Sequence, residues 1–253
     1  MDTIFIVGTA GSGKSLLTSR LLQWYKDNNN IYATSLNLDP GAISLPYEPD
    51  IDVRDYIDIN TLMERYSLGP NGSLIMASDM IASKLDEIQE EVDNINPDLI
   101  IIDSPGQIEL FAFRASGPYF MSNFKSDNKT TIFTFDGVLV SSPINYVSIS
   151  LLAASVKLRL GLAQINVLTK RDMVIENLQE ILEWADSDSA LELALGKERN
   201  AEQSLLSLEL MKNLSKSGFA QNIIAVSSTT LSGMVNLSAA LSRIMTYGDE
   251  IKE

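Results

Sequence analysis

The sequence predicts an α/β fold in which a mostly parallel sheet is covered by helices on both faces. Short runs rich in β-branched residues alternate along the chain with longer segments of helical periodicity. The short runs are apolar throughout, which is typical of strands that are buried on both faces. A chain of 253 residues fits one such domain, so we expect a single domain over residues 1–253.

The first strand is expected from Thr3 to Gly8, because this run stays apolar until it stops at glycine. Another strand is expected from Leu99 to Ile102, and it runs directly into Asp103. Alternation of strands with helices implies parallel pairing, because each helix carries the chain back across the sheet. In chain order, the expected strands are 3–8, 31–38, 99–102, 130–135, 165–168 and 223–226.

The clearest expected helix covers residues 81–95, where apolar residues recur at spacings of four and three before Pro97 closes the segment. A helix over 59–66 is expected to break at Gly69-Pro70-Asn71-Gly72. The other expected helices are 14–28, 143–162, 175–185, 201–215 and 231–246. Residues 40–56 are predicted to form a long functional loop, and residues 186–200 an insertion loop.

The composition excludes several kinds of chemistry. The chain has 19 Lys and Arg, 33 Asp and Glu, a net charge of −14, and no Cys or His. It therefore has no disulfide, zinc ribbon, iron–sulfur cluster or imidazole base. The acidic balance argues against a direct nucleic-acid surface and against a polybasic membrane patch. No basic region precedes the first apolar run, and residues 147–163 contain Lys157 and Arg159, so we expect no signal peptide, no membrane span and a cytoplasmic protein.

The first motif is Gly8-Thr9-Ala10-Gly11-Ser12-Gly13-Lys14-Ser15, which fits G-x-x-x-x-G-K-[ST] between a strand and a helix. Its glycines let backbone N–H groups turn toward phosphate oxygens, and the helix dipole adds to the attraction. Lys14 is expected at the β- and γ-phosphates and Ser15 at Mg²⁺. We therefore expect a P-loop NTPase fold, G-domain-like and Rossmann-like with three layers, whose phosphate contacts include Gly8, Ala10, Gly11, Ser12, Gly13, Lys14, Ser15 and Leu16.

The second motif, Asp103-Ser104-Pro105-Gly106-Gln107, follows a predicted strand. An aspartate there can hold Mg²⁺ through a water, Gly106 can offer its N–H to the γ-phosphate, and Gln107 can orient the attacking water. An ordinary strand-terminating turn is the alternative interpretation.

The third motif, Thr169-Lys170-Arg171-Asp172, follows the predicted strand 165–168. The Asp172 carboxylate can accept both guanine N1–H and the exocyclic amine, and the stem of Lys170 can cover the base. A solvated charge run is the alternative. The run Ser227-Ser228-Thr229-Thr230 either adds a base contact through Ser227 or caps a helix before Leu231, and both interpretations stay open.

Together these loops resemble those of GTPases, and Gly69-Pro70-Asn71 makes the chain similar to the GPN-loop GTPases in particular. This family belongs to the branch of P-loop GTPases that also contains signal-recognition and nitrogenase-iron-type nucleotide switches. The segment Asp103 to Phe111 resembles the family's D-T-P-G-Q-x-E segment, and Leu38 to Gly41 resembles its switch-one L-D-P segment. The matches fall between residues 8 and 230, with a GPN-loop insertion around residues 58–96.

The resemblance implies a homodimer whose nucleotide sites face one another. The Gly69-Pro70-Asn71 loop of one subunit is expected at the phosphates of the other, so that Asn71 acts in trans. Asp39 is expected near the attacking water and, with Ser15 and Asp103, at the Mg²⁺ site. By analogy alone, the protein client is expected in the RNA polymerase machinery.

Three positions depart from the family or its relatives. Ser104 stands where threonine is usual. Thr169 replaces the asparagine of N-K-x-D, which is expected to remove an amide that braces the phosphate loop and guanine. Thr9 is not the lysine found in related dimeric ATPases, so no trans-acting loop lysine is expected.

We therefore expect Mg²⁺-dependent GTP hydrolysis by a homodimeric switch or assembly factor. Arg114 is expected to pair with Glu109 at the surface and not to assist the reaction. A small-molecule kinase stays open as an alternative, although residues 186–200 contain only Lys197 and Arg199 where a kinase lid would be rich in arginine. A non-hydrolysing, nucleotide-dependent scaffold is the other alternative.

Overall fold

The computed structural model describes residues 1–28, 31–216 and 222–250, and its centre is a seven-stranded sheet in the order β3-β2-β4-β1-β5-β6-β7. Every neighbouring pair of strands is parallel, which confirms the predicted sheet type. The strands are β1 Asp2–Gly8, β2 Ala33–Asn37, β3 Ile51–Asp52, β4 Leu99–Asp103, β5 Asn128–Asp136, β6 Ala163–Thr169 and β7 Ile223–Ala225.

Strand β3 was not predicted, because it falls inside the segment 40–56 that the sequence marks as a loop. It pairs Ile51 with Leu36 and Asp52 with Asn37. Two residues are too few to show any periodicity, so nothing in the pattern distinguishes this edge strand from a loop.

The helices also depart from the prediction in places. The expected helix 81–95 is a short 3₁₀ turn, η2 (Ile81–Lys84), followed by α4. Residues 186–200 are not an insertion loop, because they contain α9, whose N-cap Ser187 accepts a hydrogen bond from the Ala190 N–H. The helices are α1 Lys14–Asn28, α2 Ile59–Tyr66, α3 Pro70–Met80, α4 Leu85–Ile95, α5 Ile108–Ala112, α6 Ser116–Asn123, α7 Pro143–Leu160, α8 Leu178–Asp186, α9 Asp188–Leu195, α10 Ala201–Lys216 and α11 Met234–Glu250.

Helix α3 was missed because the Gly69-Pro70-Asn71-Gly72 run suggested only a break. In the structure Gly69 is the N-cap and Pro70 is the first helical residue. Proline suits this position, because its missing N–H has no partner in the first turn and its fixed φ is already helical. The same residues therefore end one segment and begin the next.

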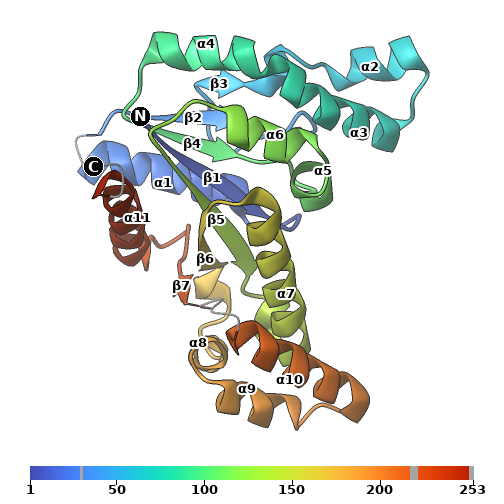
Figure 1. Cartoon of the computed structure of the whole chain (residues 1–253), viewed down its shortest axis with the longest axis vertical. Coiled ribbons are helices and arrows are strands. Elements are labelled where there is room, and N and C mark those ends of the chain that lie inside the picture. Colours follow the sequence, from blue (N-terminus) through green and yellow to red (C-terminus); the bar gives the residue numbers. More distant parts are fainter. Residues whose placement is uncertain (29–30, 217–221, 251–253) are drawn as a thin grey trace.

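The core divides into two layers on opposite faces of the sheet. Ile4 and Ile6 of β1 belong to a cluster with α1 and α11, whereas Phe5 and Val7 belong to the larger cluster on the other face. Figure 1 shows α1 and α11 on one side of the sheet and α7 on the other. Both faces of the central strands are buried, which explains their continuous apolar runs and confirms the predicted three-layer arrangement.

Parallel pairing brings the ends of the central strands to one edge of the sheet. Ile6 of β1 pairs with Asp103 of β4, and Asp136 of β5 pairs with Thr169 of β6. The loops that follow β1, β4 and β6 therefore leave the same edge, where ligands of open α/β sheets bind. Among the described residues, no helix is long and apolar enough to cross a bilayer.

Candidate functional site

The loop between β1 and α1 wraps tightly against β5. A Cβ atom on Gly8 would lie 2.0 Å from the Thr134 hydroxyl, so only glycine fits there. Gly13, with φ +86°, turns the chain into α1 through a conformation that other residues rarely adopt. The Ser12 hydroxyl lies 2.7 Å from both the Thr9 carbonyl and the Thr134 hydroxyl. These contacts with β5 fix one side of the loop, whereas Ala10 and Gly11 on its other side are exposed.

Lys14 is folded under this loop and is only 6% exposed. Its ammonium donates to the carbonyls of Gly8 at 3.2 Å and Thr9 at 2.9 Å, and reaches that of Gly106 at 3.4 Å. Burial lowers the pKa of the Lys14 ammonium, and the nearby Asp103 carboxylate opposes that change. A buried cation held by neutral carbonyls is ready to exchange them for phosphate oxygens.

Asp103 is 1% exposed at the end of β4. Burial raises the pKa of its carboxyl from 3.8 to about 6, whereas the Ser15 hydroxyl and the Lys14 ammonium oppose the rise. Its Oδ2 accepts a hydrogen bond from the Tyr47 hydroxyl at 3.2 Å, but its buried Oδ1 has no partner. A buried carboxylate oxygen without a partner is costly, and it marks a position suited to a cation or its water.

The residues around Asp103 fit Mg²⁺. Ser15, Asp39 and Asp103 supply the hard oxygen ligands that Mg²⁺ prefers, and the free Oδ1 of Asp103 is available. Within the described part of the chain, no cluster of three or more Asp, Glu, His or Cys residues could hold a metal alone. The protein would thus supply one side of the coordination shell, and phosphate oxygens and water the rest.

Asp39 joins two of the predicted motifs. Its Oδ1 accepts from the Gly41 N–H at 2.9 Å, and its Oδ2 accepts from the Gly106 N–H at 2.8 Å. The N–H that was predicted to meet the γ-phosphate therefore meets a carboxylate in this structure. Gln107 is exposed at the start of α5, and no side-chain hydrogen bond is seen for it within the described residues.

Thr169 corrects one expectation from the sequence, because it does brace the phosphate loop. Its hydroxyl lies 2.7 Å from the Ser12 carbonyl and 3.0 Å from that of Phe135. The hydroxyl thus performs the bracing expected to be lost with the asparagine amide. Next to it, Lys170 has a left-handed φ of +56°, and its ammonium lies 2.6 Å from the Asp136 carboxylate.

The predicted base contacts lie in different surroundings. Asp172 is half-buried in the 3₁₀ turn η4 (Arg171–Met173) and lines a pocket of about 420 Å³. Ser227 is fully buried, and its hydroxyl accepts from the N–H groups of Thr229 and Thr230 at 3.3 and 3.0 Å. The predicted helix cap before Leu231 is wrong, because α11 begins at Met234 and Ser227 closes a turn instead, whereas the base contact stays a prediction.

Gly69, Pro70 and Asn71 are exposed where α2 meets α3, in a pair of helices that projects beyond the sheet (Figure 1). Among the described residues, no hydrogen bond or ion pair joins them to the phosphate loop. The pair does pack on the segment that carries Asp39, because a Cβ on Gly41 would lie 2.6 Å from Cδ2 of Leu74.

The predicted pairing of Arg114 with Glu109 is wrong. The Arg114 guanidinium contacts both oxygens of Asp79, at 2.6 and 2.5 Å. Asp79 lies near the end of α3, which the sequence did not predict as a helix. Nothing in the sequence therefore indicated that Asp79 lies beside Arg114.

Three residues of the site were not predicted. Thr134 supports Ser12, Asp136 holds Lys170, and Tyr47 contacts Asp103. Asp136 could have been found, since it directly follows the predicted strand 130–135, just as Thr169 follows the predicted strand 165–168. Tyr47 lies in the segment 40–56, which was predicted to be a functional loop, but no pattern singled out this residue.

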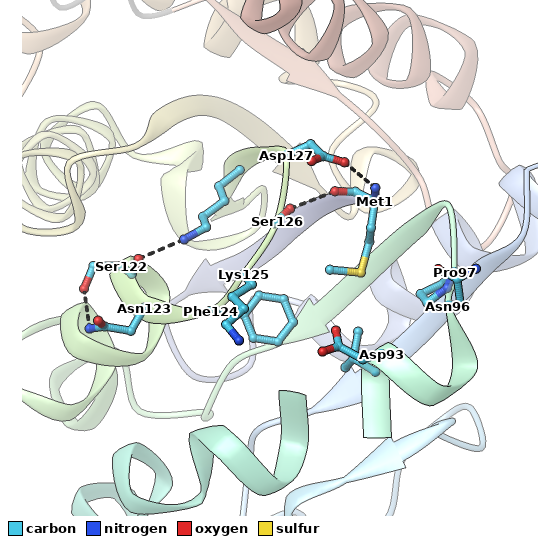
Figure 2. A pocket seen from close by; sticks show the side chains of 12 residues that line it. Met1, Asp93, Asn96, Pro97, Ser122, Asn123, Phe124, Lys125, Ser126 and Asp127 are labelled. Carbon is cyan, nitrogen blue, oxygen red and sulfur yellow. Dashed lines mark hydrogen bonds and ion pairs between the residues drawn. The ribbon is translucent and has the colours of Figure 1, made fainter. Parts of the chain in front are cut away.

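A second hollow, of about 590 Å³, lies at the opposite edge of the sheet, near the start of β1 and β5. Figure 2 shows the Met1 amino group beside Asp127, and these groups are 2.6 Å apart. The Lys129 ammonium donates to the carbonyls of Met121 and Ser122. The Met1 amino group and the Lys129 ammonium are therefore already engaged, and the hollow contains none of the predicted site residues.

Comparisons with known proteins agree with this geometry. A family model described as "Conserved hypothetical ATP binding protein" matches residues 6–247. The sequence is 34% identical to the GPN-loop GTPase PAB0955 of Pyrococcus abyssi over 179 residues, which cover 70% of each chain. It is 32% identical to the GPN-loop GTPase QQT2 of Arabidopsis thaliana over 236 residues, which cover 90% of this chain and 59% of the plant protein. The crystal structure of PAB0955, "a GTPase in Apo form", superimposes with a TM-score of 0.83 at 27% identity over 96% of both chains.

Proposed function

The chain belongs to the GPN-loop GTPase family, and from this membership we propose that it binds GTP and hydrolyses it in a Mg²⁺-dependent reaction. The observation that carries the proposal is the group under the phosphate loop. It combines a buried lysine, a buried aspartate with one free oxygen, and a second carboxylate on the Gly106 N–H. Phosphoryl transfer depends mainly on positioning and charge stabilisation, so a chain without histidine can perform it.

The phosphate loop binds the nucleotide through its N–H groups and Lys14. On binding, the Lys14 ammonium exchanges the carbonyls of Gly8 and Thr9 for β- and γ-phosphate oxygens. Ser15, Asp103 and Asp39 would hold Mg²⁺, which would supply positive charge that stabilises the phosphate groups. Water attacks in line, and the leaving GDP oxygen stays against the loop.

Asp39 and Gly106 distinguish GTP from GDP. A γ-phosphate oxygen takes the Gly106 N–H that Asp39 now accepts, so the carboxylate is released beside the phosphate. There Asp39 and Gln107 position the attacking water. GDP has no such oxygen, so the contact between Asp39 and Gly106 persists, and the two nucleotide states differ in this loop.

Guanine preference is assigned to Asp172, with the stem of Lys170 against the base. The ion pair between Lys170 and Asp136 supports this, because it fixes the end of the stem. The family description names ATP whereas the relatives are named GTPases, so base preference is the first property to measure.

We also propose a homodimer in which Asn71 of one subunit completes the site of the other. The exposure of Gly69, Pro70 and Asn71 supports a target outside their own chain.

The proposal also includes one P-loop domain over residues 1–253, a cytoplasmic location, and a role as an assembly factor with a protein client. That client is assigned to the RNA polymerase machinery by analogy alone.

The test is competition of GTP, ATP and CTP against fluorescent GDP, followed by measurement of phosphate release with and without Mg²⁺. GTP is expected to compete best, and phosphate release is expected to need Mg²⁺. Lys14→Ala should abolish binding of GDP and GTP, whereas Lys26→Ala at the exposed end of the same helix should change neither. GDP binding by Lys14→Ala at wild-type affinity would refute the scheme.

The same experiment separates the alternatives. Transfer of phosphate to a nucleoside or sugar, with no release into water, would indicate a kinase. Tight GTP binding with turnover no faster than in buffer would indicate a scaffold.

A further inference from the structure

Tyr47 contacts the proposed metal site from the predicted functional loop 40–56, and this residue has been given no role so far. Residues 40–50 leave the sheet after Asp39 and return to it at β3. From this segment the Tyr47 hydroxyl donates to Oδ2 of Asp103 at 3.2 Å. Asp39, just before this segment, accepts from the Gly106 N–H, so residues 39–50 contact the 103–107 loop at two places.

The contact leaves the two oxygens of Asp103 in different states. Oδ2 is held by Tyr47, whereas Oδ1 is buried and has no partner. The last torsion of an aspartate side chain is broad and roughly two-fold, so a partner on one oxygen narrows the directions in which the other can point. Hydrogen-bond partners behind a metal ligand commonly serve this purpose, because they hold the ligand in the orientation that the metal requires.

We propose that Tyr47 is a positioning residue, whose hydroxyl fixes the Asp103 carboxylate so that its free Oδ1 faces the Mg²⁺ site beside Ser15. The inference rests on the proposed function, since it assigns Tyr47 to the metal site of that reaction. Tyr47 touches neither the nucleotide nor the metal in this scheme and acts through Asp103.

The segment around Tyr47 is fastened firmly enough to serve this purpose. The Pro46 carbonyl accepts from the Ser19 hydroxyl of α1 at 3.2 Å. On the other side of Tyr47, Asp50 accepts from the backbone N–H and the hydroxyl of Ser35 at 2.8 and 2.9 Å. The tyrosine is therefore held between two anchors, one on α1 and one on β2.

The hydroxyl holds Asp103 as a hydrogen-bond donor. A phenol has one proton to donate, and the Tyr47 hydroxyl donates it to Oδ2 of Asp103.

Tyr47→Phe tests the proposal, because it removes the hydroxyl and keeps the ring. The measurement is Mn²⁺ binding to the GDP complex, followed through the free-ion EPR signal and displaced with Mg²⁺. We expect the Kd for either ion to rise about tenfold, the lower end of the range for losing such a partner. GDP affinity in EDTA should stay within about twofold of wild type, because the phosphate loop is untouched. In steady state, the Mg²⁺ concentration for half-maximal hydrolysis should rise more than kcat falls.

Tyr56→Phe is the matched control. Its hydroxyl also donates to a carboxylate, Oε2 of Glu91 at 2.5 Å, but at the surface of α4. This variant should bind metal and GDP as the wild type does.

The outcomes separate the inference from the proposed function. Metal affinity of Tyr47→Phe equal to that of wild type would refute the positioning role. An equal loss in Tyr56→Phe, or a parallel loss of GDP affinity in EDTA, would also refute it, since either indicates a general effect on the fold. If wild-type protein binds no GDP with Mn²⁺, the proposed function itself is wrong.

Discussion

Replacing Asp103 by asparagine is expected to remove a pH-dependent loss of stability from the metal-free protein. Burial raises the pKa of this carboxyl from 3.8 to about 6. The native state therefore holds the proton more tightly than the unfolded chain does. The protonated carboxyl therefore contributes its full stabilisation below the pKa of the unfolded chain. This stabilisation is lost as the pH rises through the pKa of the native state.

The shift sets the size of the effect. A difference of about two pKa units corresponds to about 3 kcal/mol, and a nine-tenths buried group needs no discount for solvent. About 1.4 kcal/mol of this falls between about pH 5 and about pH 7.5. For a chain of this length, that corresponds to a change of about 3–6 °C in Tm. The asparagine amide has no proton to lose in this range, so the free energy of unfolding of Asp103→Asn should not show this decrease.

The assay is thermal unfolding of nucleotide-free protein in EDTA, followed by circular dichroism across that range. The quantity of interest is the Tm of Asp103→Asn minus that of wild type, because other carboxylates cancel in the difference. It should grow by about 3–6 °C toward the higher pH. Asp86→Asn, on the exposed side of α4, is the control and should give a constant difference. A constant difference for Asp103→Asn would refute the reasoning.

Other substitutions test the rest of the site. Thr169→Val leaves the Ser12 carbonyl without its hydroxyl partner and should lower the free energy of unfolding by about 1–2 kcal/mol, as measured in urea. Thr131→Val removes a buried hydroxyl that has no partner and should cost nothing; equal losses would contradict the bracing role. Asp172→Asn should weaken GTP binding by about 10–100-fold and relax the preference for guanine, whereas unchanged GTP and ATP affinities would show that the base assignment is wrong. Asn71→Ala should lower turnover about a hundredfold at unchanged nucleotide affinity, and mixing it with Lys14→Ala subunits should restore activity; no restoration would remove the support for action in trans.

The sheet could be predicted because its central strands are buried on both faces. The run from Thr3 to Gly8 has no polar side, and only a strand between two layers of helices tolerates that. Elements whose sequence signal was short, or could be interpreted in two ways, were missed. Strand β3 has two residues, and the Gly-Pro pair before Asn71 both breaks the chain direction and begins α3. Helix α9 was missed because residues 186–200 gave no clear helical pattern.

Much of the site could also be predicted, because a parallel sheet delivers the ends of its central strands to one edge. Lys14, Asp103 and Thr169 were found in this way. The contacts of Thr134 and Tyr47 were not, since they depend on register and on the path of a loop. Gly8 meets Thr134 only because β1 and β5 pair in that register, and one residue of slip would turn the hydroxyl to the other face.

The acidic composition acquires a different meaning once the site is described. The exposed carboxylates of α4, such as Glu87 and Glu90, face solvent and are screened beyond a Debye length of about 8 Å. The charges that matter are those at the loop, where one ammonium from Lys14 faces the carboxylates of Asp39 and Asp103. These three groups sum to −1 when all are ionised, so they would repel a polyphosphate that arrived alone. The same two carboxylates attract a divalent cation, and the cation attracts the nucleotide. The local charges therefore favour a ligand that arrives with Mg²⁺, and each of the two should tighten the binding of the other.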